Sequence, residues 1–189
     1  MRKSVAIGLI LVVVSIFSAT LFAQSTDRDG QVRKGDLAVE IGAGFGAHGT
    51  EFGFGVALVP GVEWILADWN IAGAVPLAIG VAAKGSIGLV PATGFAFGAD
   101  ALATLHLGFD GEDAPALCHD LDLYTAIGAG FVYIIKAGVP FGLVFPSVYL
   151  GIAWYFSENL AVYLEGVYRH GWRAVGYGGA VVGVRLLTS

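Results

Sequence analysis

The feature that most constrains the fold is an alternation of side chains with a period of two. In Leu37–Gly46 the odd positions carry Leu, Val, Ile, Ala and Phe, whereas the even positions carry Ala, Glu and Gly. Phe52–Trp64 repeats the pattern, with Pro and large apolar residues on one parity and Gly, Ala, Val and Glu on the other. Because successive side chains of a strand point to opposite faces of a sheet, the alternation predicts β-strands with one bulky apolar face and one small face.

Segments that carry two polar residues provide a test of this interpretation. Under a period of two, both members of a pair must fall on the same face, and agreement in four segments is expected by chance about once in sixteen. All four pairs agree: Glu51 with Glu63, Asp100 with His106, Asp122 with Lys136, and Glu165 with Arg169. The pattern therefore favours strands throughout the part of the chain that these four pairs span, from Glu51 to Arg169.

Clusters of Gly, Pro, Asn and Asp separate the apolar stretches and predict turns between the strands. An even number of strands returns both ends of a closed barrel to the same side, as bacterial outer-membrane barrels require. We expect eight strands, at Asp36–Gly46, Glu51–Leu66, Val75–Leu89, Phe95–Phe109, Asp122–Lys136, Leu143–Phe156, Asn159–His170 and Ala174–Leu187.

The relative bulk of the two faces indicates which one meets water. A soluble protein would bury the bulky face, but 56% of this chain is apolar, against roughly 45–50% in soluble domains. A core of Gly, Ala and Glu would pack poorly, whereas a narrow barrel lumen accepts small and long polar side chains. We therefore predict an all-β fold, a transmembrane antiparallel up-and-down β-barrel of about eight strands whose bulky face meets lipid.

Charged residues fall on the small face, where they would line the lumen. Taking these charges out of water is costly unless they pair, so we expect a network of ion pairs that closes the barrel to most solutes. The alternative is that the many inward Gly and Ala residues leave a narrow passage for small solutes. The predicted lumen charges are Glu40, Glu63, Lys84, Asp100, Glu165, Arg169 and Arg185.

Aromatic residues gather near the ends of the predicted strands, as they do in the interfacial girdles of membrane barrels. The other interpretation is that aromatic residues are frequent in any β-protein, since 12% of this chain is Phe, Trp or Tyr. One predicted rim carries Trp64, Trp69, Trp154 and Phe156, and the other carries Phe45, Phe95, Tyr168 and Trp172.

The first 23 residues resemble a secretory signal peptide, with Arg2 and Lys3, an apolar run over Val5–Phe17, and a small-residue zone that ends at Ala23. An uncleaved anchor helix is the alternative. The polar residues 24–35 predict a periplasmic lead-in segment without a core, followed by the barrel domain over 36–189. The expected location is the bacterial outer membrane, reached by secretory export.

Hydropathy alone would make Gly138–Ser157 a transmembrane helix, because this run is uncharged and long enough to span a bilayer. Two prolines and several glycines interrupt it, and charged residues cut the other apolar stretches below spanning length. A multi-helix membrane protein is the rival fold, but these interruptions favour the barrel.

Composition and motifs narrow the function. The net charge of −5 offers no basic face for nucleic acid. Cys118 and His119 lie in an acidic connection, but the spacing matches no calcium or zinc motif, so we expect no metal or cofactor. We find no nucleophile with a base and predict no enzyme; the minor alternative is a membrane-embedded enzyme using His106 with Asp100 or Glu165.

In strand number, face alternation and charged lumen, residues 36–187 resemble the small eight-stranded bacterial outer-membrane barrels, the class of the OmpA transmembrane domain, OmpX and OmpW. The resemblance implies membrane lipid and the outer-membrane assembly machinery as partners. No functional site of these families carries over residue by residue. The chain departs from the class by ending in VVGVRLLTS rather than in an aromatic residue.

The predicted connections also depart from the class, whose outer loops are longer than its periplasmic turns. The outward connections would be AHGT, VPATG, AGVPFG and GWR, whereas the longest, Gly111–Leu121, would lie in the periplasm. Short outer connections offer little surface to a partner. We therefore expect a structural role or a narrow passage for a small solute, with a surface interaction or adhesion protein of the same fold as the rival.

Overall fold

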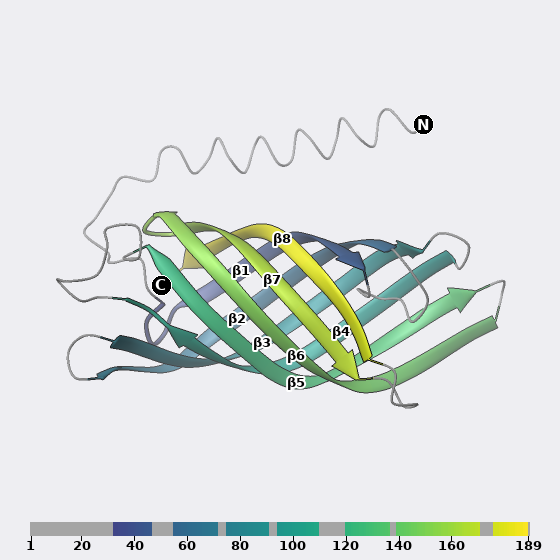
Figure 1. Ribbon diagram of the computed structural model, residues 1–189, viewed down its shortest axis with the longest axis horizontal. Coiled ribbons are helices and arrows are strands. Elements are labelled where there is room, and N and C mark those ends of the chain that lie inside the picture. The colour runs from purple at the N-terminus through teal and green to yellow at the C-terminus, as the bar shows by residue number, and fades with distance from the viewer. Residues whose placement is uncertain are drawn as a thin grey trace.

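The computed structural model describes residues 32–46, 55–71, 75–90, 94–109, 120–136, 139–170 and 176–188. These residues form a closed barrel in which each strand pairs antiparallel with the next one along the chain (Figure 1). The predicted all-β barrel of eight strands is confirmed. The strands are β1 Leu37–Gly46, β2 Gly55–Ile71, β3 Val75–Val90, β4 Gly94–Leu107, β5 Leu121–Lys136, β6 Val139–Ser157, β7 Leu160–His170 and β8 Gly176–Thr188.

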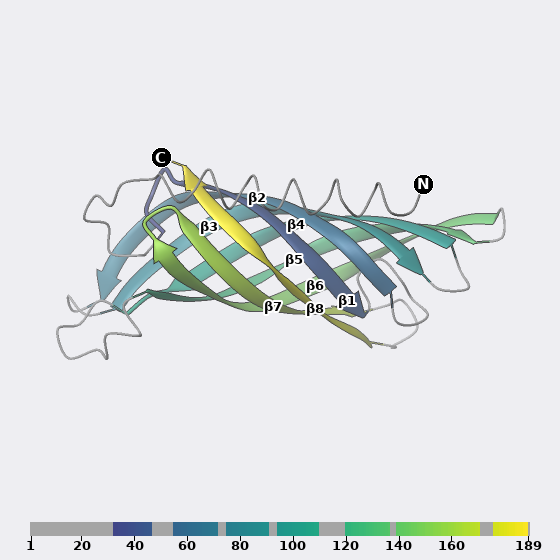
Figure 2. The same cartoon turned by 90° about the horizontal axis from the view of Figure 1, so that it is seen from above.

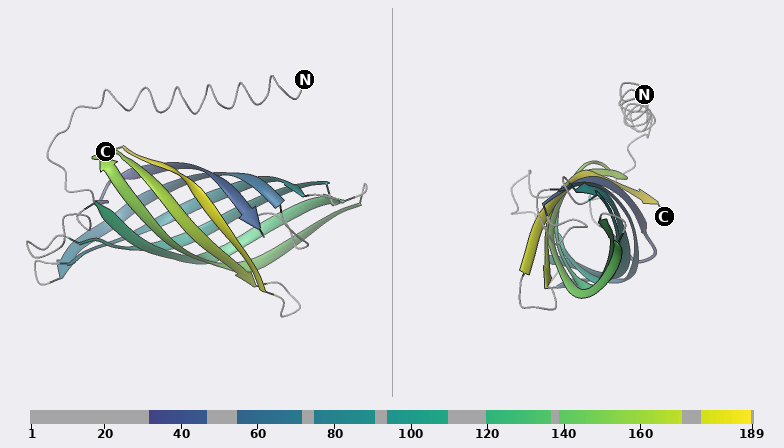
Figure 3. Two further views of the ribbon diagram at one scale, coloured as in Figure 1. Left: turned by 45° about the horizontal axis from the view of Figure 1, so that its top comes forward. Right: turned by 90° about the vertical axis from the view of Figure 1, so that its right-hand side faces the viewer.

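The barrel closes between its first and last strands, which pair from Leu37 with Thr188 to Gly46 with Gly179. The strands run at a steep tilt to the barrel axis (Figure 2), and the end-on view of Figure 3 shows them as one ring. Closure leaves no sheet edge along the paired length. β1 begins beside the end of β8, so the first and the last strand residues both lie at the same opening of the lumen. We call this opening the terminal mouth.

Most described strand boundaries lie within two residues of the prediction, and the end of β2 and the start of β6 differ by more. β2 continues to Ile71, and β6 begins at Val139, so most of AGVPFG is strand rather than an outward connection. Proline was taken as a turn residue, but Pro140 pairs with Ile135 in the β5–β6 ladder. A proline fits a ladder at a position whose N–H is not needed, and residue spacing alone does not reveal such positions.

The connections follow from the strand ends. Residues 47–54 between β1 and β2, which include the predicted connection AHGT, lie outside the described residues, and only residues 137–138 separate β5 from β6. The longest gap between strands, residues 108–120, lies on the side of the terminal mouth, as expected. Most of it is outside the described residues, including Cys118 and His119.

The rival helical interpretation of Gly138–Ser157 is wrong. This run forms β6, which pairs with β5 on one side and with β7 on the other. In the described part of the chain, no helix is long and apolar enough to cross a bilayer.

A bulge in β2 changes which residues face outward. The β2–β3 register shifts between Ile65 and Ala67, so the parity of the outward face changes at this point. Trp64 and Trp69 have opposite parity, yet both are exposed, at 54% and 45%. The bulge therefore extends the outward apolar face past the position at which a strict period of two would have turned it inward.

The outward face is predominantly apolar, and aromatic side chains lie at both of its ends. Near the terminal mouth the exposed rings are Trp64, Trp69, Trp154 and Phe156, and near the opposite mouth they include Phe45, Phe95 and Tyr168. Trp172 lies outside the described residues. Such a surface suits a bilayer rather than water.

The predicted signal peptide, residues 1–23, and the lead-in residues 24–31 lie outside the described residues. The rest of the predicted lead-in is described, and it is not free of the core. Val32 is 6% exposed and packs in the same cluster of buried residues as Tyr155 and Leu187. This short segment therefore belongs to the packed end of the barrel.

Candidate functional site

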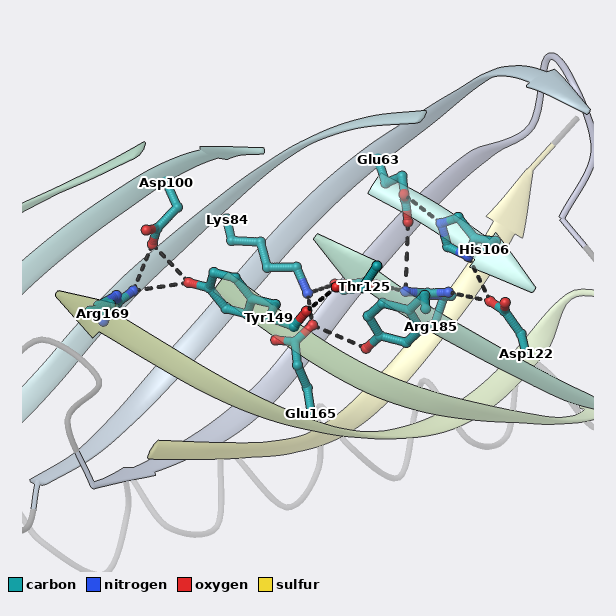
Figure 4. A network of polar contacts seen from close by, with 12 residues as sticks. Glu63, Lys84, Asp100, His106, Asp122, Thr125, Tyr149, Glu165, Arg169 and Arg185 are labelled. Carbon is teal, nitrogen blue, oxygen red and sulfur yellow. Dashed lines mark hydrogen bonds and ion pairs between the residues drawn. The ribbon is translucent and has the colours of Figure 1, made fainter. Parts of the chain in front are cut away.

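The structure places all seven predicted lumen charges on the inward face of the barrel, each exposing 5% or less of its surface. They come from six strands, because alternate residues of every strand point inward. Figure 4 shows most of these side chains in contact across the lumen. The residues are Glu40 of β1, Glu63 of β2, Lys84 of β3, Asp100 of β4, Glu165 and Arg169 of β7, and Arg185 of β8.

Arg185 is the hub of the charges near the terminal mouth. Its Nε donates to Glu40 Oε1 at 2.7 Å, and its Nη1 donates to Asp122 Oδ2 at 3.1 Å. Nη2 lies 3.6 Å from Glu63 Oε2. The side chain is fully buried, so one guanidinium contacts three carboxylates that are all shielded from water.

His106 joins two of these carboxylates. Its Nδ1 lies 2.8 Å from Asp122 Oδ2, and its Nε2 lies 2.8 Å from Glu63 Oε1 (Figure 4). An ionised carboxylate only accepts hydrogen bonds, so both ring nitrogens must donate, which the imidazolium form does. His106 therefore adds a fourth cationic group to the lumen.

Lys84 occupies the middle of the network. Its ammonium forms ion pairs with Glu165 and with Glu40, whose Oε2 lies at 2.9 Å. Three tyrosine rings surround the ammonium at 5.3–5.7 Å from their centroids, a distance at which cation–π attraction operates; the rings are those of Tyr124, Tyr149 and Tyr163. The Tyr124 hydroxyl also donates to Glu165 at 3.0 Å.

A second group of polar side chains surrounds Asp100, on the side of Lys84 away from the terminal mouth. Arg169 Nη2 donates to Asp100 Oδ2 at 2.6 Å. The same carboxylate accepts from the Tyr149 hydroxyl at 2.9 Å and from the Ser147 hydroxyl at 2.5 Å. Because the Tyr149 ring also lies beside the Lys84 ammonium, it connects the two groups.

Inward glycines make room for these side chains. A Cβ at Gly151 would collide with the Tyr124 ring, and a Cβ at Gly42 would lie 2.5 Å from the Tyr163 hydroxyl. The small residues that suggested a free passage beside the charges therefore leave room for the rings of tyrosines on nearby strands. At these depths the described lumen is filled by side chains.

Sequence reasoning omitted several members of the network. His106 and Asp122 share the parity of the inward face of their strands, so the alternation could have included them. The inward tyrosines were harder to find, because aromatic residues of membrane barrels are usual at the outward interfacial girdles. Tyr differs from Phe in carrying a hydroxyl that needs a hydrogen-bond partner, and the lumen offers such partners. The omitted residues are His106, Asp122, Tyr124, Ser147, Tyr149 and Tyr163.

Tyr149→Phe tests the second group. Removal of the hydroxyl leaves Asp100 and Arg169 with one fewer buried hydrogen-bond partner, and we expect the free energy of unfolding to fall by about 1–3 kcal/mol. Urea unfolding of the barrel in lipid vesicles measures it. The matched control is Tyr133→Phe, whose ring is on the outward face, and which should stay within about 0.5 kcal/mol. Equal effects of the two changes would contradict the assignment.

The geometry also bears on metal binding and catalysis. Within the described ranges, no group of three or more His, Cys, Asp or Glu side chains is arranged to hold a metal ion. The catalytic pairing considered from the sequence does not form, because His106 contacts Glu63 and Asp122 rather than Asp100 or Glu165. Arg185 also contacts both partner carboxylates, so this arrangement resembles a structural ion-pair cluster.

Comparison with known proteins is informative only at the level of structure, since no protein-family model and no curated protein matches the sequence. The N-terminal β-barrel domain of Pseudomonas aeruginosa OprF is similar, with a TM-score of 0.56 and 16% sequence identity over 82% of this chain and 98% of that one. The outer membrane enzyme PagL gives a TM-score of 0.54 at 12% identity, covering 80% of this chain and 98% of its own.

Ail, the attachment invasion locus protein of Yersinia pestis, gives a TM-score of 0.52 at 12% identity, covering 82% of this chain and 99% of its own. One of these three proteins is named as an enzyme and another as an attachment protein, so the property that they share is the barrel architecture. Together with the closed ring of eight strands and the apolar outward face, the likeness shows that the chain has the fold of the small bacterial outer-membrane β-barrels.

Proposed function

We propose that this protein is an integral outer-membrane barrel with a structural role, whose lumen is closed by paired charges and tyrosines rather than open as a pore. The observation that carries the proposal is the continuous network from His106 to Arg169, which crosses the lumen at several depths. Eight strands enclose an interior that side chains can just fill. An open passage would require this network to be displaced.

The charge balance supports a network that is part of the fold. Five inward carboxylates face Lys84, two arginines and His106, and each of these cationic groups contacts at least one carboxylate. Breaking one buried pair leaves an uncompensated charge, so the pairs resist opening. The carboxylates are Glu40, Glu63, Asp100, Asp122 and Glu165.

Location in the outer membrane is part of the same proposal. The apolar outward face with aromatic rings at both ends supports it, as does the likeness to outer-membrane barrels. In this arrangement the terminal mouth faces the periplasm. Residues 1–23 would direct export, and the assembly machinery of the outer membrane would insert the barrel.

Single-channel recording in a planar bilayer tests the closed lumen. We expect no steady conductance from the unaltered protein. Removing two lumen rings in Tyr149→Ala/Tyr163→Ala should produce discrete steps, because the space they fill becomes available to water and ions. The matched control, Tyr133→Ala/Tyr168→Ala, removes two outward rings and should stay closed.

Folding of every variant is checked by the shift of its electrophoretic band on boiling, which reports an intact barrel. Steady conductance from the folded, unaltered protein would overturn the proposal and favour the narrow passage. A folded Tyr149→Ala/Tyr163→Ala variant without steps would show that these rings do not close the lumen.

A further inference from the structure

Residues 32–36, which we call the N-terminal strap, lie across the terminal mouth. Gly35 N–H donates to the Ile65 carbonyl at 2.9 Å, and Ile65 N–H donates to the Asp36 carbonyl at 3.0 Å. The strap thus extends the β1–β2 ladder beyond Leu37, where β1 begins. Its backbone is held by β2, and it reaches the barrel interior through a buried side chain.

That side chain is Val32, which is 6% exposed and packs with Ala78, Tyr155 and Leu187. Val32 also lines a small cavity whose wall includes Ala78, His106 and Asp122. On the lumen side of this cavity lie the charges that His106 contacts. The strap therefore separates the ion-pair network from the solvent at the terminal mouth.

A tight turn returns the strap towards the barrel. Arg33 N–H donates to Asp36 Oδ2 at 2.8 Å, and Asp36 N–H donates to the Arg33 carbonyl at 3.0 Å. Lys34 N–H reaches Asp68 Oδ1 at 3.3 Å. Arg33, Lys34 and Gly35 are exposed, whereas Val32 and Asp36 are buried, so the side chains that enter the barrel lie at the two ends of the strap.

The strap differs from the barrel strands in how it is held. Each strand is paired on both sides around the closed ring. In the strap, the backbone N–H groups of Lys34 and Gly35 donate to β2, and three of the five residues are exposed. Segments with few buried contacts open locally at a lower free-energy cost than the global fold. Opening of the strap would leave the ladder between β1 and β8 intact.

We propose that the N-terminal strap is a displaceable cover of the terminal mouth, which keeps solvent from the Glu63–His106–Asp122 cluster until it is released. The groups that face this cover from the barrel are His106, Asp122 and, behind them, Glu63 and Arg185. Release would expose a charged site that the closed structure hides. This cover is separate from the closure of the lumen by its central charges and tyrosines.

Thiol labelling measures access beneath the strap. Ala78 is 3% exposed and lines the same cavity as Val32, so Ala78→Cys in a Cys118→Ser background places one thiol under the cover. The full-length protein in lipid vesicles is treated with a membrane-impermeant maleimide. We expect slow labelling with the native strap and at least tenfold faster labelling in Val32→Asn, because an amide is poorly accommodated in this apolar contact.

The matched control is Lys34→Asn, which introduces the same residue at an exposed strap position and should leave the labelling rate unchanged. Asp36→Ala removes the side chain that accepts from Arg33 N–H, and it should speed labelling even if Val32→Asn does not fold. Fast labelling with the native strap, or equal rates in the folded variants, would overturn the proposal. Conductance is recorded in parallel, so that failure of the closed lumen and failure of the cover are distinguishable.

Discussion

Arg185→Ala is expected to lower the free energy of unfolding by about 3–5 kcal/mol, the range found when one member of a buried ion pair is removed. The change leaves Glu40, Glu63 and Asp122 without their shared guanidinium in a site shielded from water. Lys84 and His106 compensate only part of this charge. Urea unfolding in lipid vesicles gives the difference, and the band shift on boiling shows whether the barrel forms.

Two comparisons isolate the cause. Arg185→Met/Glu40→Gln removes one cation and one carboxylate, and we expect it to be more stable than Arg185→Ala by at least about 1 kcal/mol, because fewer buried charges remain unpaired. Lys34→Ala, at an exposed position, should stay within about 0.5 kcal/mol of the unaltered protein. A loss below 1 kcal/mol in Arg185→Ala would mean that the cluster does not depend on its guanidinium.

Gly128→Ala is expected to lower the free energy of unfolding by about 2–3 kcal/mol, or to prevent formation of the folded band. A Cβ at this position of β5 would collide with the Ala101 carbonyl oxygen and would lie 2.9 Å from Leu102 Cα. Both contacts are with the backbone of β4, which cannot rotate away as a side chain can. Urea unfolding measures this change too.

The matched control is Gly166→Ala on β7. There the nearest atom to a new Cβ is the Leu150 carbonyl oxygen, at 3.8 Å, and the position faces outward. Because alanine restricts the unfolded chain more than glycine, we expect an unchanged or slightly higher stability, by up to about 1 kcal/mol. If the two variants were equally destabilised, the close approach of β4 to β5 at Gly128 would not explain the effect.

Much of the architecture could be predicted because a strand pattern is local. The parity of Glu40, Glu63 and Arg185 follows from their neighbours in the sequence, and all three lie inside the barrel. The same rule fails where the backbone departs from a regular strand. The bulge between Ile65 and Ala67 places Trp69 outward. No residue type at this point predicts that the outward face changes parity.

The partners of each charge could not be predicted in the same way. Arg185 Nε contacts Glu40, which is 145 residues away along the chain, because β8 closes the ring against β1. His106 contacts Glu63 across the lumen, and the two residues come from strands that do not pair with each other. Such contacts depend on the tilt of the strands and on the register of every pair around the ring.

The sequence by itself determined the strand number, the inward face of the charged residues and the apolar outward surface, because each depends on the alternation of neighbouring side chains. Only the tertiary structure decided which charges pair, that tyrosines fill the space beside the inward glycines, and that Val32 packs among the buried residues near the terminal mouth. These features join residues from distant strands, whose separation in space is set by closure of the barrel rather than by local sequence.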